Sequence, residues 1–170
     1  MVFLQPQHGK RCAAKNGFQG QGPATHDDSF PNPKHKVLNM ADLFSEEWMQ
    51  RFAEEWNKEP ELAGALEKIG FTSSIAYGFD GEEKPRGILV VENGKAVTGA
   101  AFAGQEMNWD LRASQDNWSK WIQKGLGTMG LGMAYTTRKL KFNVGDYGAM
   151  IKDPRMAAPF IKSFTVMGRV

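Results

Sequence analysis

The stretch "RGILVVENGKAVTGAAF", residues 86–102, decides the fold. Apolar residues lie on both sides of Asn93 and Gly94. Asn and Gly both tolerate positive φ angles, which a tight primed turn requires at its two central positions. The stretch therefore predicts a β-hairpin that turns at Asn93-Gly94.

Three further segments alternate apolar and polar residues with the period of a strand. The first is "FTSSIAYGF", residues 71–79, which precedes the hairpin. The second is "EMNWDLRAS", residues 106–114, and the third is "RKLKFNVGD", residues 138–146. The sequence thus predicts five strands. The first four follow one another as a meander, which favours an antiparallel arrangement.

The first helix is predicted in "MADLFSEEWMQRF", which begins at Met40. Aromatic residues recur there every four positions, and Asp42 or Ser45 can cap the helix N-terminus. The stripe consists of Phe44, Trp48, Phe52 and Trp56. We expect this stripe to pack on a core, and its exposure to a membrane or a partner protein is the alternative.

Two more helices are predicted later in the chain. One covers "DNWSKWIQK", residues 116–124, and the other covers "PRMAAPFIKSFTVM", residues 154–167. Pro159 is expected to kink or split the last helix because proline lacks the N–H that a helix interior uses. Helices at both ends of a run of strands indicate the α+β class.

The segment "GLGTMGLG", residues 125–132, has the glycine spacing of a dinucleotide-binding loop. Such a loop needs a strand before it and a helix directly after it, whereas here a helix is predicted before and a strand after. We therefore expect no nucleotide site. Gly125 is expected to end the preceding helix in a left-handed conformation. The rest is expected to be a methionine-containing loop, which either packs on the core or admits a lipid-like ligand.

The N-terminal part of the chain differs in composition from the rest. Residues 1–39 contain four of the eight prolines and carry five basic and two acidic residues. Without apolar periodicity, they are interpreted as a disordered tail or an upstream extension, with or without a role of its own. A domain is predicted over residues 40–170, with 16 basic and 17 acidic residues. This balance does not suit a nucleic-acid-binding surface.

The residue types of the predicted domain restrict its chemistry. All three histidines and the single cysteine, Cys12, lie in residues 1–39. The domain therefore has no histidine base, no cysteine nucleophile and no ordinary zinc site. A metal site formed by His8, Cys12 and His26 is not favoured, because their spacing is irregular. No metal and no cofactor are predicted, and with no internal disulfide and no long apolar run a cytoplasmic protein is expected.

Two segments resemble the type-2 sterol carrier protein domain. "NWSKWIQKG" is similar to the tryptophan-bearing helix that follows the fourth strand of that family. "MAYTTRKLKFNVGDYGAMIK", residues 133–152, is similar to its late strand, with Lys139-Leu140-Lys141 before Gly145-Asp146. The resemblance extends over about residues 42–167. The family has a glycine where this chain has Arg138, and residues 125–132 are richer in glycine than the family pattern.

The resemblance implies a five-stranded mixed, mainly antiparallel sheet, covered by helices on one face, with an apolar ligand tunnel. It implies non-covalent carriage of a sterol, a fatty acid, a fatty acyl-CoA or a similar lipid, without catalysis. The C-terminal Met-Gly-Arg-Val is not the peroxisomal signal that some members carry.

Candidate ligand-binding residues are apolar side chains of the late strands and the terminal helix. They are Trp109, Leu131, Met133, Phe142, Met150, Phe160 and Phe164, each of which also suits an ordinary core. Asn108, Gln105 or Arg112 could orient a ligand head group, although an exposed strand face explains them as well.

Two other functions remain open at this point. The chain could be a small enzyme, or an accessory subunit of one, that acts on a hydrophobic substrate through Asp110, Asp116, Asp146 or Tyr135. Helix capping explains Asp116 and Asp146 better. The chain could also be a docking module that contacts partner enzymes through the aromatic helix. A transient contact with a membrane surface or an enzyme is compatible with each function, and the sequence does not define the oligomeric state.

Overall fold

The computed structural model describes residues 42–170, and the predicted tail, residues 1–39, lies outside the described residues. The helices, in chain order, are α1 (Glu46–Lys58), the short π-helix η1 (Pro60–Gly64), α2 (Ala65–Glu67), α3 (Gln115–Lys124), α4 (Thr128–Thr136), α5 (Tyr147–Lys152) and α6 (Pro154–Met167). The strands are β1 (Ser73–Phe79), β2 (Gly87–Glu92), β3 (Lys95–Ala101), β4 (Trp109–Ala113) and β5 (Leu140–Val144). The α+β class is confirmed.

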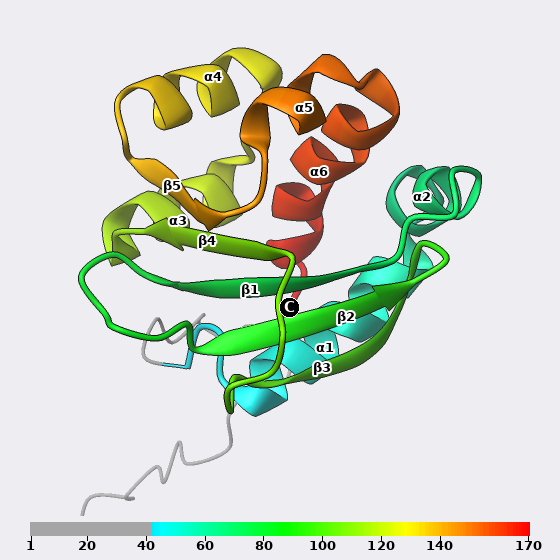
Figure 1. Cartoon of the computed structure of the whole chain (residues 1–170), viewed down its shortest axis with the longest axis horizontal. Coiled ribbons are helices and arrows are strands. Elements are labelled where there is room, and N and C mark those ends of the chain that lie inside the picture. Colours follow the sequence, from blue (N-terminus) through cyan, green and yellow to red (C-terminus); the bar gives the residue numbers. More distant parts are fainter. Residues whose placement is uncertain (1–41) are drawn as a thin grey trace, which may run out of the picture. The chain divides into compact units, whose positions relative to one another are not determined.

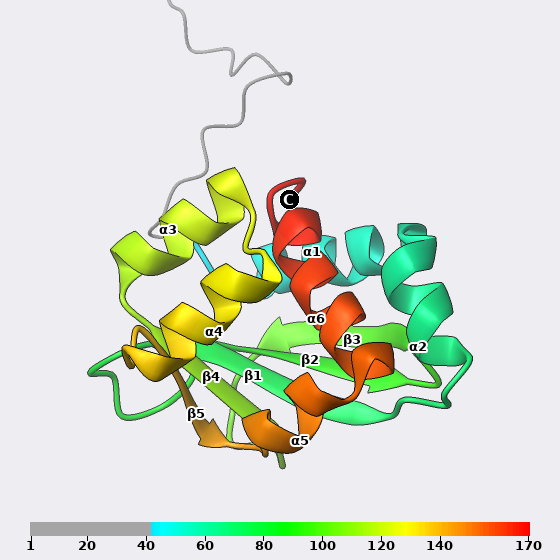
Figure 2. The ribbon, with the colours of Figure 1, turned by 90° about the horizontal axis from the view of Figure 1, so that it is seen from above.

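The five strands form one mixed sheet in the order β3-β2-β1-β4-β5. Three of its four pairings are antiparallel, and β1 pairs with β4 in parallel, so that Ile75 lies opposite Trp109. Helices α1, α3, α4 and α6 lie on the same face of the sheet (Figure 2). The mixed, mainly antiparallel sheet covered on one face is therefore confirmed.

The antiparallel meander was wrong at one place, because β4 does not pair with β3. Residues 102–108 instead cross the helix-free face of the sheet and bring β4 next to β1 (Figure 1). Asn108 holds the end of this crossover: its side-chain oxygen accepts hydrogen bonds from the Ser73 hydroxyl and, at 2.8 Å, from the Ser74 amide. Alternation alone cannot reveal such a crossover, because it does not identify the neighbouring strand.

The hairpin turn is confirmed, with φ angles of 47° at Asn93 and 80° at Gly94. The backbone of α2 comes so close that a Cβ on Gly94 would lie 2.2 Å from the Glu67 nitrogen. The Trp56 indole N–H donates to the Gly94 carbonyl at 2.9 Å. The turn is thus fixed by its own conformation and by the end of α1.

Helix α1 begins after Ser45, whose hydroxyl accepts a hydrogen bond from the Trp48 amide. Its aromatic side chains Trp48, Phe52 and Trp56 are buried among the core residues. In Figure 1 the helix passes behind β2 and β3. A docking module that uses this aromatic stripe is therefore wrong, because the stripe is already packed against the sheet.

The glycine-rich segment differs from its prediction as a loop. Gly125 ends α3 with a φ of 76° and a ψ of 166°, so its φ is positive but its backbone is extended and not helical. Helix α4 then begins at Thr128 and continues to Thr136. A helix and not a strand precedes the glycines, so they still lack the setting of a dinucleotide loop.

The last helix continues through Pro159, where the sequence predicts a kink or a split, and the split is therefore wrong. Asp153 caps α6 by accepting a hydrogen bond from the Arg155 amide at 3.0 Å, and Pro154 occupies the first turn. Pro159 is buried within the helix. Proline removes one backbone hydrogen bond at this site, and the packing of α6 against neighbouring helices offsets that loss.

Candidate ligand-binding site

An apolar cavity of about 30 Å³ lies between the sheet and the C-terminal helices. Nine side chains line it, and none of them is charged. They are Trp56, Leu66, Phe71, Ile75, Trp109, Leu111, Met150, Met156 and Phe160. The surroundings of the cavity favour an apolar occupant, since burial of a charged or unpaired polar group among such side chains is costly.

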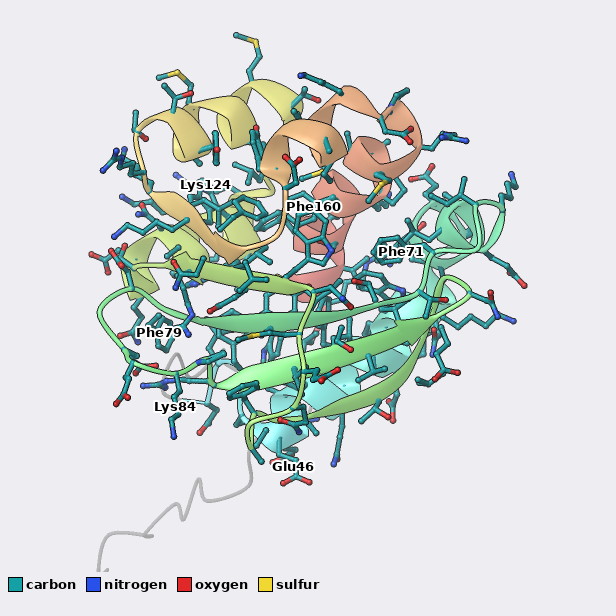
Figure 3. All side chains as sticks on the ribbon, viewed as in Figure 1. Glu46, Phe71, Phe79, Lys84, Lys124 and Phe160 are labelled. Atoms are coloured by element: carbon teal, nitrogen blue, oxygen red, sulfur yellow. The ribbon has the colours of Figure 1, made fainter. Side chains whose placement is uncertain are left out.

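Three groups of elements build the cavity. Strands β1 and β4 supply Ile75, Trp109 and Leu111, because alternate residues of a strand point to one face. Helices α5 and α6 supply Met150, Met156 and Phe160, while α1, α2 and the segment before β1 supply the remaining side chains. Figure 3 labels Phe71 and Phe160, which approach the sheet from distant parts of the chain.

The outer wall of the cavity consists of four half-buried side chains: Phe71, Trp109, Met156 and Phe160. The other five lining residues are buried. The cavity therefore has a deep part that is sealed by the core and an outer part that is closed by side chains alone.

Gly145 determines where the Trp109 ring can lie. Its φ is 105°, and an added Cβ would lie 2.2 Å from the Trp109 ring. The indole fills the space that the missing side chain leaves free, and Phe142 packs against it edge to face at 6.0 Å between ring centroids. The glycine before Asp146 thus shapes one wall of the cavity.

The seven side chains expected to bind a ligand do not all meet. Trp109, Met150 and Phe160 line the cavity together. Phe142 lies behind two of them, with its ring centroid 6.0 Å from Trp109 and 6.0 Å from Phe160. Helix α6 places Phe164 in the closed core, where its ring stacks on Trp118.

The two candidates on α4 lie apart from the cavity lining. Leu131 is fully buried, whereas Met133 is 63% exposed. Successive residues of an α-helix are about 100° apart, so two positions further along the helix a side chain faces nearly the opposite way. The face of α4 that packs inward carries Leu131 and Ala134.

Sequence reasoning missed six lining residues: Trp56, Leu66, Phe71, Ile75, Leu111 and Met156. Four of them belong to predicted apolar patterns, namely Trp56, Phe71, Ile75 and Leu111. Periodicity shows that such a side chain faces inward, but it does not show whether another side chain or a void lies opposite.

The polar residues considered for the ligand head group are occupied elsewhere. Arg112 and Asp110 form a buried ion pair, with Nη2 to Oδ2 at 3.1 Å, and Arg112 also donates to the Glu82 carbonyl at 2.9 Å. Both alternate with Leu111 along β4 and therefore point to the other face of the sheet. Gln105 accepts a hydrogen bond from the Ala103 amide.

The acidic residues considered for catalysis have structural partners. Asp146 caps α5 by accepting a hydrogen bond from the Ala149 amide at 2.9 Å, as expected. Ser114 caps α3, so Asp116 lies in its first turn. Tyr135 stacks on Tyr147, with 3.8 Å between the ring centroids. The pKa of Tyr147 is raised mainly by burial and, to a smaller extent, by the nearby Tyr135. Among residues 42–170, no three His, Cys, Asp or Glu side chains gather into a metal-binding group.

The end of α6 is tied to η1, beside the cavity, by two ion pairs. Arg169 contacts Glu59 at 2.8 Å, and Lys162 contacts Glu61 at 2.6 Å. Burial is the largest single influence on the pKa of Glu59 and raises it, but the hydrogen bonds from Arg169 and the Glu61 amide, together with the charges of Lys162 and Arg169, outweigh burial and lower that pKa. These contacts hold the helix that carries Phe160.

None of the described helices, all within residues 42–170, combines the length and the apolar character of a membrane-spanning segment.

Known structures share this architecture. No protein-family model matches the sequence, and no curated protein matches it. A crystal structure of sterol carrier protein 2 superposes with a TM-score of 0.61 at 19% identity, over 75% of this chain and 98% of the other. A Thermus thermophilus protein described as a possible sterol carrier protein superposes with a TM-score of 0.53 at 16% identity, over 74% of this chain and 85% of the other. The chain therefore has the fold of the type-2 sterol carrier proteins.

Proposed function

We propose that the protein binds and carries a hydrophobic molecule, without catalysing a reaction, in the apolar cavity beneath α5 and α6. The observation that carries the proposal is the lining of that cavity by nine side chains, none of them charged. The fold supports the proposal, because a solved protein with the same architecture is named a sterol carrier. A sterol, a fatty acid or a fatty acyl-CoA has the required apolar part.

The cavity must widen to admit such a molecule. Ligand pockets typically measure roughly 300–1,000 Å³, at least ten times the volume of about 30 Å³ seen here. Two of the nine lining residues, Met150 and Met156, are flexible thioethers that can adapt to irregular shapes. We propose that α5 and the first turn of α6 move away from the sheet when a ligand enters, and that the form described here is the closed one.

The expected affinity follows from burial of the ligand chain. Each buried methylene contributes about 0.8 kcal/mol, so a dozen contribute roughly 10 kcal/mol. Association and ordering cost about 4–15 kcal/mol, and widening the cavity adds to that cost. With a cost near the lower end of that range, the difference allows reversible binding of a long chain and little binding of a short one, as carriage requires.

Native mass spectrometry of the purified full chain, followed by extraction and identification of the bound molecules, tests the proposal. We expect a series of lipid-sized mass additions that organic extraction removes. The same chain, stripped of lipid, should bind a fluorescent long-chain fatty acid saturably and a short-chain analogue weakly. If the lipid-free protein binds neither fatty acyl probes nor sterol probes, the proposed carrier function is wrong.

A further inference from the structure

Helix α4 exposes apolar side chains that a helix of a water-exposed domain normally buries. Its sequence, "TMGLGMAYT", has no charged residue, and only Leu131 and Ala134 are buried. Met129 is 87% exposed, and Met133 is 63% exposed. These two side chains are four residues apart and therefore neighbours on one face of the helix. In Figure 3 sulfur-tipped side chains project outward from α4.

The chain around α4 is strongly basic. Residues 117–145 contain five basic and no acidic residues, whereas the other described residues contain 11 basic and 17 acidic ones. Four of the five cations, Lys120, Lys124, Arg138 and Lys139, are exposed, and the structure pairs none of them with a carboxylate within residues 42–170. The fifth, Lys141, contacts Asp80 at 2.7 Å. The apolar helix is thus flanked along the chain by four cations whose charge no carboxylate within residues 42–170 neutralises.

A surface hollow of about 500 Å³ lies at the end of α4. Its lining combines two cations with aromatic and hydroxyl groups: Tyr135, Thr136, Arg138, Leu140, Lys141 and Phe142. Arg138 has a φ of 57°, a left-handed conformation that glycine adopts without strain but arginine does not. Strained backbone conformations cluster at functional sites. The exposed, strained Arg138 beside this hollow therefore points to a binding role that offsets its cost in stability.

We propose that this surface, made by Met129, Met133 and the cations Lys120, Lys124, Arg138 and Lys139, docks on a lipid bilayer that contains anionic lipids. The two methionines enter the boundary between head groups and acyl chains, while the cations contact phosphates and carboxylates. Apolar burial combined with attraction to anionic lipid is how interfacial helices bind membranes. The docking goes beyond the proposed function, because it requires no occupied cavity.

The observations favour a bilayer over a second copy of the chain. Two copies that met through α4 would bring two unneutralised basic surfaces together. Stable protein interfaces also bury about 1,200–2,000 Å² in total, more than two thioether side chains and their neighbours provide. A bilayer offers negative charge and an apolar layer at once, and it accepts a small inserted area.

Sedimentation of the full chain with vesicles tests the proposal. We expect binding to vesicles of phosphatidylcholine and phosphatidylserine, weak binding to phosphatidylcholine alone, and release by added salt because salt screens the attraction. A cation near an anionic surface contributes enough for roughly a fivefold change in partition. Arg138→Gly should therefore weaken partition roughly fivefold while raising the melting temperature, since the backbone strain is relieved.

Matched control variants distinguish an effect of this surface from the effect of removing any surface charge or any exposed apolar side chain. Lys84, labelled in Figure 3, lies apart from α4 in the β1–β2 connection, and Lys84→Ala should leave partition unchanged. The double variant Met129→Ser/Met133→Ser should weaken partition at least roughly tenfold. Val97 is an exposed residue of β3, and Val97→Ser is its control, with no expected effect.

Four outcomes overturn the proposal. Equal binding to both vesicle types excludes the role of anionic lipid, and equal losses in Lys84→Ala and Arg138→Gly exclude the role of this site. A dimer in sedimentation equilibrium that the double methionine variant dissociates identifies a second copy as the occupant. Binding of polyglutamate that persists in the methionine variant identifies an acidic protein partner instead.

Discussion

The aromatic core beneath α1 and the cavity beneath α5 and α6 are built from the same kinds of side chain but differ in packing. In the aromatic core, the Phe44 ring lies 5.0 Å from Trp118, 5.3 Å from Trp48 and 5.5 Å from Tyr77, between ring centroids. Phe44, Tyr77 and Trp118 are at most 1% exposed. The cavity instead has a void and four half-buried walls. One region is filled, and the other contains the space in which the proposed ligand would bind.

The largest expected effect lies in the filled region. Phe52 is fully buried on α1, and its ring contacts Trp48, Trp56 and Tyr77. Phe52→Ala should lower the free energy of unfolding by about 3–5 kcal/mol, because the surrounding rings cannot close the space. Urea denaturation measures this loss. A cost as small as that of a surface substitution would show that the aromatic core is no better packed than the cavity.

The second-largest effect is expected at Gly145, which lies between the sheet and the cavity wall. Gly145→Ala places a Cβ against the Trp109 ring at a positive φ, and we expect a loss of about 1–3 kcal/mol. The displaced indole should also change the tryptophan fluorescence spectrum of the native protein. Gly81 has a φ of 89° but no atom within 4 Å of an added Cβ, so Gly81→Ala measures the backbone strain without the clash. If the two variants lose the same stability, Gly145 does not position Trp109.

The comparison is sharpest within α6, where two phenylalanines are one turn apart. Phe160 faces the cavity and is half-buried, whereas Phe164 is fully buried. Phe160→Ala should cost about 1–2 kcal/mol of stability, less than Phe164→Ala, because part of its ring meets a void. Binding of a fluorescent fatty acid to the folded protein should weaken more in Phe160→Ala than in Phe164→Ala. The reverse order would place the ligand outside this cavity.

The smallest effect concerns pH and the ion pairs that hold the end of α6. Arg169 and the Glu61 amide lower the pKa of Glu59 in the folded protein, although burial opposes them. A carboxylate with a lowered folded pKa stabilises the fold above its unfolded pKa, and this stabilisation is lost as the pH falls through the folded pKa. The melting temperature should therefore decrease on acidification, and less steeply in Glu59→Gln. Parallel curves for the two proteins would exclude Glu59 as a contributor.

Sequence reasoning reached the fold through features that act locally. The Asn93-Gly94 turn, the Ser45 cap and the aromatic stripe of α1 depend on neighbouring residues, and each lies as expected. The crossover of residues 102–108 and the helix at Thr128 depend on tertiary packing, which single-sequence patterns do not contain.

The site was harder to predict for a related reason. Phe160 and Phe164 have the same residue type and occupy the same predicted helix, and both face inward. Whether a void or another ring lies opposite is set by residues distant in sequence, such as Phe71 for Phe160 and Trp118 for Phe164. Met133 is predicted to lie in the ligand site but lies on the surface. A methionine is adaptable enough for either place, so residue type does not distinguish them.

The parallel pairing of β1 and β4 also bears on how the molecule assembles. The β2–β3 hairpin closes over a two-residue turn, whereas Ile75 and Trp109 are separated along the chain by the whole hairpin and the crossover. Contacts between residues distant in sequence form late, because a long loop must first be closed. Ile75 and Trp109 both lie in the cavity wall. We therefore expect the cavity wall to be completed late in folding, so that a newly made chain would gain the proposed binding capacity only after β1 and β4 have paired.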